Sequence, residues 1–469
     1  MLKRSIALFA CLSLFFTCLV YPAGASPALP TLPDFSITQE QWNDDWQELG
    51  NNNTNVCLTP GSDQTQLNFA WHSNPADGLP TVKMSKNPNM NGAAVFTGTV
   101  APADGIFNTS RVTASGMEPL TKYYYTYGNA NNVFGPFVYR TLAWDSFKFL
   151  YVNDLHAGFN PENDAVGRDK AYKIHATIDT ALKLNPDISF MIAGGDQTDS
   201  GVMPEEWNGL LTSSVFRSLP ASFAIGNHDK KGVTQKYYIN NPNEYNALLP
   251  SPVGKENWFR YGDVLFLLFD STNGNAADHL NFAKNAINKN LDAKWRIGVI
   301  HNDINSPGFG FLDMDNNLIR IIFTTIFDRA GLDVLLNAHS HIYGRSHFLK
   351  GGKIVDWGFG RQITNPQGTT YISMSAVNNV ARQTLPWQNI WTAKRCRDDI
   401  TTYSTFEVNE DSLKFKAFYD TGQRCDAYTI KKTVNDSKPF EEPAGFDLYS
   451  IVKLGGFIYT VIDMIGKMG

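Results

Sequence analysis

The stretch ISFMIAGGDQTD, residues 188–199, decides the fold that we expect for this chain. Its first half is an apolar run with the length of a buried strand, and its second half is a glycine-containing turn that ends on carboxylates. Four further polar blocks follow apolar runs in the same way: Asp154-Leu155-His156, Gly226-Asn227-His228-Asp229, His301 and His339-Ser340-His341. Five of the chain's nine histidines lie in these blocks, which indicates one shared site.

The regions around these blocks alternate strands with helices, which predicts an α/β layered domain over residues 144–430. Strands are expected at residues 147–152, 188–193, 222–225, 264–269, 296–300, 334–336 and 370–374, and helices at 169–185 and 319–329. Ligands of open α/β sheets bind at the carboxyl ends of the strands. We therefore expect the polar blocks to meet at such an edge.

The N-terminal part of the chain has another pattern. Residues 56–143 contain short alternating runs separated by Gly, Pro and Asn, which predicts a small all-β sandwich. Within it, GMEPLTKYYY at residues 116–125 is similar to a strand and turn of fibronectin type III modules. Residues 26–55 form a polar arm in which Trp42 and Trp46 are one helical turn apart, and we expect this arm to pack on the sandwich.

The two ends of the chain carry signals of their own. Residues 1–25 have basic, apolar and small-residue regions in the order of a signal peptide, which predicts a secreted or periplasmic protein. Residues 431–469 form a C-terminal tail, in which residues 446–468 could form an amphipathic helix. Charged residues interrupt this helix too often for it to span a bilayer. Peripheral membrane contact and docking on the protein's own surface both stay open, and the modest basic charge favours docking.

The cysteines and the overall charge narrow the class of protein. After removal of the signal peptide three cysteines remain, and Cys396 with Cys425 is the favoured bridge because Cys57 lies in the separate N-terminal module. Three free thiols are the alternative. The net charge of −5 gives no basic surplus, which argues against general nucleic-acid binding.

The residue types in the blocks point to metal chemistry. A mixed set of oxygen and nitrogen ligands suits Zn, Mn or Fe better than Ca. Asp196 could bridge two ions held about 3.5–4 Å apart, as two-metal hydrolases require. One ion would then take Asp154, His156 and His341, and the other would take Asn227, His301 and His339. His228 is left to face the substrate, with Asp229 expected to orient it.

Taken together, the blocks are similar to those of the calcineurin-like metallophosphoesterase superfamily, and the preceding sandwich resembles the arrangement in purple acid phosphatases. His341-Ile342-Tyr343-Gly344-Arg345 is also similar to the family's segment after the last histidine. Two departures are clear. Asp199 stands where purple acid phosphatases have the iron-binding Tyr, which speaks against a purple ferric site, and His156 stands where they have Gly. Asp199 could either support a ligand histidine or sit on a polar loop.

The resemblance implies a metal-dependent phosphoric ester hydrolase. The first hypothesis is a phosphatase of monoesters, in which a metal-bridged hydroxide attacks phosphorus in line and His228 assists the leaving oxygen. A phosphodiesterase or nucleotide pyrophosphohydrolase is the alternative, and a non-catalytic binding protein on the same fold is the third. The sequence decides neither the physiological substrate, nor the native metals, nor the oligomeric state.

Overall fold

A computed structural model describes residues 29–442, apart from residues 51, 104, 131, 249–250, 306, 308–313, 379–388 and 398, and gives only the backbone of residues 314–318. The expected signal peptide and the helix expected at residues 446–468 lie outside the described residues. No helix within the described part of the chain has the length and apolar character needed to cross a membrane.

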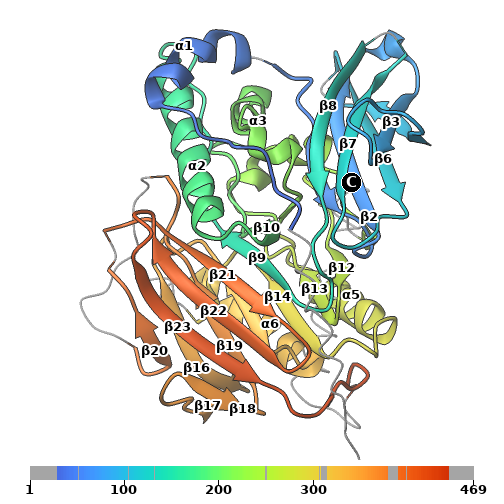
Figure 1. Ribbon diagram of the computed structural model, residues 1–469. Coiled ribbons are helices and arrows are strands. Elements are labelled where there is room, and N and C mark those ends of the chain that lie inside the picture. The colour runs from blue at the N-terminus through green and yellow to red at the C-terminus, as the bar shows by residue number, and fades with distance from the viewer. Residues whose placement is uncertain are drawn as a thin grey trace, which may run out of the picture.

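The N-terminal sandwich consists of two four-stranded sheets (Figure 1). One has the order β1-β2-β6-β5, with β1 Cys57–Pro60, β2 Gln66–Ser73, β6 Asn108–Ser115 and β5 Thr99–Pro102. The other has the order β4-β3-β7-β8, with β4 Ala94–Thr97, β3 Pro80–Ser85, β7 Lys122–Asn129 and β8 Asn132–Arg140. Alternate residues of β7, such as Tyr123, Tyr125 and Tyr127, point into a core shared with Trp71.

Two larger sheets form the second domain. The seven-stranded sheet has the order β11-β10-β9-β21-β22-β23-β18, with β11 Ala221–Phe223, β10 Ile188–Ala193, β9 Phe147–Val152, β21 Thr402–Val408, β22 Ser412–Tyr419, β23 Arg424–Lys431 and β18 Gln362–Thr364. The eight-stranded sheet runs β12-β13-β14-β15-β19-β16-β17, with β20 paired to β16. Its strands are β12 Asn257–Tyr261, β13 Val264–Leu268, β14 Trp295–Val299, β15 Val334–Asn337, β19 Thr369–Ser373, β16 Gly344–Lys350, β17 Lys353–Asp356 and β20 Thr392–Arg395.

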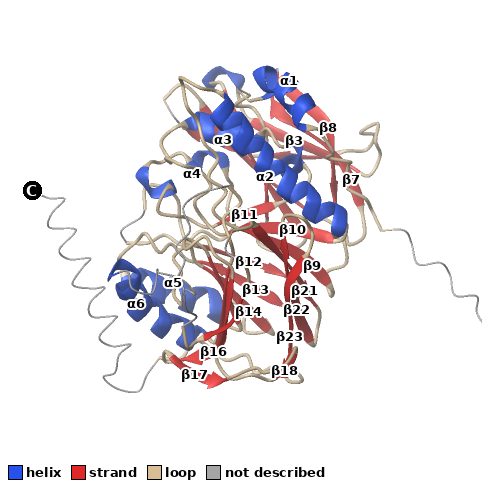
Figure 2. Ribbon diagram, turned by 90° about the vertical axis from the view of Figure 1, so that its left-hand side faces the viewer, coloured by secondary structure: helices blue, strands red, loops and turns tan. Residues whose placement is uncertain are grey.

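Helices cover the outer faces of these two sheets (Figure 2). The helices α2 (Ala165–Leu184) and α3 (Pro204–Leu211) pack on the first sheet, and α5 (Ala276–Asn288) and α6 (Met314–Ala330) pack on the second. Aromatic side chains from both sheets, including Phe149 and Phe266, fill the space between them. The predicted fold class, an α/β layered domain after a small all-β sandwich, is confirmed.

The arm differs from expectation in its partner. It forms the helix α1 (Gln39–Leu49), whose Trp42 and Trp46 are buried. Trp42 Nε1 donates a hydrogen bond to the Arg168 carbonyl of α2 at 3.2 Å, and the Trp42 ring lies 5.8 Å from that of Tyr172. The prediction that the tryptophans pack on the sandwich is wrong, because α2 offers the aromatic and small side chains against which indoles are buried.

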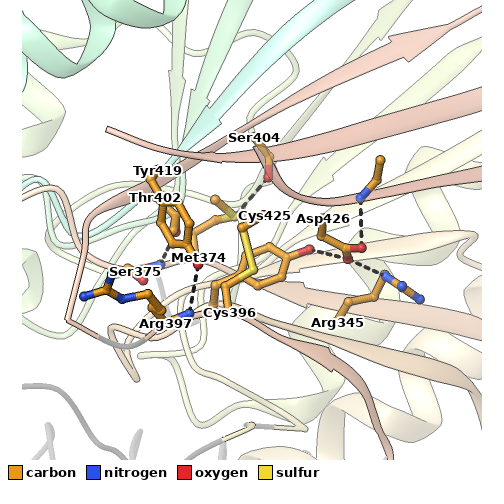
Figure 3. Close-up of a disulfide and its surroundings, with 12 residues drawn as sticks. Arg345, Met374, Ser375, Cys396, Arg397, Thr402, Ser404, Tyr419, Cys425 and Asp426 are labelled. Atoms are coloured by element: carbon orange, nitrogen blue, oxygen red, sulfur yellow. Dashed lines mark hydrogen bonds and ion pairs between the residues drawn. A yellow bond between two sulfur atoms is a disulfide. The ribbon is translucent and has the colours of Figure 1, made fainter. Parts of the chain in front are cut away.

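A disulfide joins the two sheets of the second domain (Figure 3). It links Cys396, just after β20, with Cys425 on β23, while Cys57 is a buried free thiol. The favoured pairing is therefore confirmed.

Candidate metal centre

The five polar blocks follow the carboxyl ends of parallel strands. In the first sheet β9, β10 and β11 are parallel neighbours, and they lead to Asp154, Asp196 and Asn227. In the second sheet β14 and β15 are parallel neighbours that lead to His301 and to His339-Ser340-His341. The blocks thus lie at the carboxyl ends of strands, as predicted, but these strands belong to two separate sheets instead of one.

Among the described residues, the structure brings the predicted ligands together in three overlapping groups that could hold a metal ion, of which the third consists of His156, Asp196 and His228. The first consists of Asp154, His156 and His341, whose ligand atoms lie within 4.8 Å of one another. In the second, Asp196, His301 and His339 meet the same limit. We call these the first and the second ligand group.

Asn227 joins the second group, and Asp196 lies between the two groups. Asn227 Oδ1 lies 3.0 Å from His301 Nε2 and 2.9 Å from His339 Nδ1, so the amide oxygen belongs to the second group. Asp196 Oδ2 lies 3.3 Å from His301 Nε2 and 3.8 Å from His156 Nε2. One carboxylate oxygen therefore lies between the two groups, in the place that a bridging ligand needs.

The backbone at the site adopts a rare conformation. Among the nine described non-glycine residues with positive φ, five are candidate ligands: Asp154 (48°), His156 (47°), Asp196 (50°), His339 (72°) and His341 (58°). The left-handed region is unfavourable for such residues and persists only where surrounding contacts impose it, which happens most often at functional sites. Here the His156 amide donates to the Asp196 carbonyl at 3.0 Å, and the Asp154 amide donates to the Gly195 carbonyl at 3.1 Å.

Glycines make this close packing possible. A Cβ atom at Gly226 would lie 2.1 Å from Asp196 Oδ1, and one at Gly195 would lie 2.4 Å from His301 Nδ1. Neither position has room for a side chain, so the two glycines in the motifs allow the chain to approach the candidate ligands.

Burial and charge at the site fit bound cations. Asp154, His156, Asp196 and His301 are buried, and within the described structure Asp154 Oδ1 and His156 Nε2 have no hydrogen-bond partner. Burial raises the pKa of Asp196, but the imidazoles of His301 and His156 outweigh burial and hold that pKa below its usual value. Burial lowers the pKa of His301, and the carboxylate of Asp196 outweighs it and raises the pKa to about 9.

The Asp196 carboxylate thus stays ionised and attracts positive charge, which metal ions would supply in place of protons. The Asp, Asn and His donor set suits ions such as Zn, Mn or Fe. The residues present therefore fit a dinuclear metal centre.

The outer nitrogens of two buried histidines have fixed partners. His156 Nδ1 donates to Asp199 Oδ1 at 3.1 Å, and Asp199 also forms an ion pair with Lys170. His301 Nδ1 donates to the Gly194 carbonyl at 3.1 Å. Such bonds fix the ring orientation and leave Nε2 for a metal. Of the two roles left open for Asp199, its contacts match support of a ligand histidine.

His228 and Asp229 lie at the site, but their relation differs from the expected one. His228 Nδ1 lies 2.5 Å from the Asp199 carbonyl, to which it donates, and its ring centroid lies 4.8 Å from that of His156. The carboxylate of Asp229 accepts instead from the backbone amides of Gln197 (3.0 Å) and Gly226 (2.9 Å). The expectation that Asp229 orients the imidazole is therefore corrected: Asp229 ties two ligand loops together, because unpaired buried amides attract its carboxylate.

Sequence reasoning missed two contacts around these residues. Lys231 Nζ lies 3.1 Å from His228 Nδ1, which places a positive charge beside the site. Ser340 donates its hydroxyl to the buried Asp303 and so anchors the loop between the two ligand histidines. Lys231 follows His228 by three residues and Asp303 follows His301 by two, and this closeness in the sequence could have indicated both contacts.

Two layered sheets place Asp, Asn and His side chains at facing strand ends, in an arrangement that could hold two metal ions. Residues 147–343 match the calcineurin-like phosphoesterase family, and residues 53–148 match the N-terminal domain of purple acid phosphatase. The chain therefore contains a calcineurin-like phosphoesterase domain preceded by a purple acid phosphatase N-terminal domain, as the resemblance in the sequence predicted, and these domains support a metal-dependent phosphoesterase.

Solved structures share this fold at low sequence identity. Purple acid phosphatase PPD1 from yellow lupin (Lupinus luteus) seeds is 13% identical, with a TM-score of 0.66 over 83% of this chain and 77% of that chain. PhoD is 10% identical, with a TM-score of 0.52 over 88% of this chain and 98% of that chain. No curated protein sequence shows significant similarity to the chain. At these identities the likeness extends to the fold alone.

Proposed function

We propose that this chain is a secreted or periplasmic phosphatase that hydrolyses phosphate monoesters with two metal ions. The observation that carries the proposal is the pair of ligand groups on either side of Asp196 Oδ2, 3.3 Å from His301 Nε2 and 3.8 Å from His156 Nε2. The first ion would be held by Asp154, His156 and His341, and the second by Asn227, His301 and His339, with Asp196 shared by both.

The bound ions would supply a nucleophilic water at neutral pH and neutralise the oxygens of the phosphate. His228 would be the acid of the reaction. Its Nδ1 is engaged with the Asp199 carbonyl, so Nε2 is the nitrogen that remains for the substrate. In the imidazolium form Nε2 can donate a proton to the leaving oxygen, a contribution of about 100- to 10,000-fold for a placed acid. Asp229 would act as a positioning residue for the two loops.

Positive charge near His228 favours a monoester over a diester. A phosphate monoester carries a second negative charge that a diester lacks, and Lys230 and Lys231 add exposed positive charge directly after His228 and Asp229 in the sequence. Lys231 Nζ lies 3.1 Å from His228 Nδ1, so this positive charge is next to the imidazole that we assign to the substrate.

The proposed compartment is supported by the cysteines. The Cys396–Cys425 disulfide fits an oxidising environment such as the periplasm or the extracellular medium, where such bonds persist. The proposed metals are Fe, Zn or Mn, and Asp199 at the position of the family's tyrosine speaks against a tyrosinate-bound ferric ion.

The proposal is tested by comparing hydrolysis of p-nitrophenyl phosphate and bis(p-nitrophenyl) phosphate by the metal-loaded protein, with Asp196→Asn as the inactive reference. We expect faster turnover of the monoester and loss of both activities in the variant. A preference for the diester would replace the phosphatase with the phosphodiesterase alternative. Turnover equal to that of Asp196→Asn on both esters, together with failure to bind Zn²⁺ or Mn²⁺, would support the third hypothesis, a non-catalytic binding protein.

A further inference from the structure

A buried polar cluster begins two residues after the candidate ligand His341 in the chain. Tyr343, two residues further along the chain, donates its hydroxyl to Asp426 Oδ2 at 2.8 Å. Arg345 Nε donates to the same oxygen at 2.9 Å (Figure 3). The exposed fractions are 0% for Tyr343, 7% for Arg345 and 9% for Asp426. One oxygen of Asp426 therefore holds both Tyr343 and Arg345, which follow the loop that carries His339 and His341.

The disulfide ties this carboxylate to the strand beside the loop. Cys425 is the chain neighbour of Asp426, and its partner Cys396 directly follows Arg395. Arg395 pairs with Gly344, which lies between Tyr343 and Arg345. Figure 3 shows the sulfur–sulfur bond next to Asp426, which reaches toward Arg345. The segment after His341 is thus held on one side by a side chain and on the other by a backbone pairing, and the disulfide joins the two.

The buried charges keep this cluster in one geometry. The Arg345 guanidinium lies 4.5 Å from the centroid of the Tyr428 ring as well as on Asp426. A buried guanidinium without its carboxylate is strongly unfavourable, so any movement of Asp426 that breaks the pair is opposed. Ser373 adds a further tie, since its hydroxyl donates to the Ile342 carbonyl at 2.9 Å.

The two histidines of the loop are supported differently. His339 has its own contacts within the site, because its amide donates to Asp154 Oδ2 at 3.1 Å and its ring lies against Asn227. The contacts of His341 lie in the first ligand group, with its Nε2 3.4 Å from Asp154 Oδ1 and its ring centroid 5.4 Å from that of His156, and His341 is the member of the loop nearest to the cluster in the sequence. Displacement of the cluster should therefore reach His341 before His339.

We propose that Tyr343, Asp426 and the Cys396–Cys425 disulfide are positioning elements for His341, and that they set the affinity of the first ligand group for its ion while leaving the second group unaffected. This inference rests on the dinuclear centre proposed above. The cluster touches neither ion nor substrate in this scheme and acts only through the orientation of one imidazole.

The mild variant Tyr343→Phe provides the main test. It removes one hydroxyl and keeps the Arg345–Asp426 pair. We expect equilibrium dialysis with Zn²⁺ to give two bound ions in the unaltered protein, and the variant to bind one of them about 10-fold more weakly and the other within about twofold. Tyr125→Phe is the matched control, because this buried hydroxyl donates a single 2.6 Å bond to the Arg217 carbonyl far from the site.

The disulfide is tested by Cys396→Ala/Cys425→Ala in the full chain, with far-ultraviolet circular dichroism to establish that the variant is folded. The same selective weakening, about tenfold for one ion, is expected. Unchanged affinity for both ions in Tyr343→Phe and in the folded double variant would overturn the inference, and so would equal weakening of both ions. An unaltered protein that binds no Zn²⁺ would refute the metal centre itself, which separates the two failures.

Discussion

The two ligand groups of the centre are supported by different kinds of contact. In the first group, a side chain holds one histidine, since Asp199 accepts from His156, and the cluster at Asp426 that we propose positions His341 also consists of side chains. In the second group, the backbone does more of this work, since His301 donates to the Gly194 carbonyl and Gly195 leaves no space beside the ring. A side-chain partner can be removed by one substitution, whereas a backbone carbonyl cannot. Metal affinity should therefore be easier to change in the first group.

The largest effect is expected where both groups depend on one residue. Asp196→Asn removes the charge of the shared carboxylate, so we expect loss of both ions and a fall in kcat/KM of at least about 1000-fold, or about 4 kcal/mol. Activity assays and metal analysis of the purified variant measure this. Asp411→Asn is the control, because it changes an exposed carboxylate that pairs with the buried Lys294. Loss of one ion only would show that Asp196 is not shared.

A smaller effect on both groups is expected from Gly226→Ala. The added Cβ would lie 2.1 Å from Asp196 Oδ1 and must displace it. A ligand shift of this kind costs about 100-fold in kcat. The control is Gly254→Ala, whose Cβ would meet its nearest neighbour, a methyl of Ile225, at 3.3 Å. Wild-type rates in Gly226→Ala would mean that the Asp196 loop has more freedom than its packing indicates.

The contrast between the groups is tested most directly by Asp199→Ala. His156 loses the acceptor of its Nδ1 bond, so we expect the first ion to bind about 10- to 100-fold more weakly and the second to be unchanged. Isothermal titration with Zn²⁺ separates the two ions. Asp187→Ala removes a carboxylate paired with Lys148 at 2.8 Å and serves as the control. Equal weakening of both ions would remove the distinction between side-chain and backbone support.

The smallest effect is expected at Lys170, which contacts Asp199 and no candidate ligand in the described contacts. Lys170→Gln removes the ion pair with Asp199, in which both side chains are partly exposed, and such pairs contribute about 0–1 kcal/mol. We expect the first ion to bind at most about fivefold more weakly, measured by the same titration. A loss as large as that in Asp199→Ala would mean that Lys170, rather than Asp199, sets the orientation of His156.

The sequence predicted well where the pattern of apolar residues reflects local structure. The strand at residues 147–152 has the predicted bounds, and Ala171, Ile174, Ile178 and Leu182 form the buried face of α2 as expected. The antiparallel strands β21 to β23 were missed. Leu413, Phe415 and Ala417 alternate with lysines in β22, and this period of two is a signal of a half-buried strand.

The sequence by itself determined the ligand types, their place after buried strands and the favoured cysteine pair, because these depend on residue chemistry and on short-range periodicity. Tertiary structure alone decided that Asp229 ties loops rather than orienting His228, and that Trp42 packs on α2. It also decided that Asp426 reaches Tyr343 across 83 residues. Contacts of this kind depend on the order of strands in two sheets, and local patterns along the chain carry little information about that order.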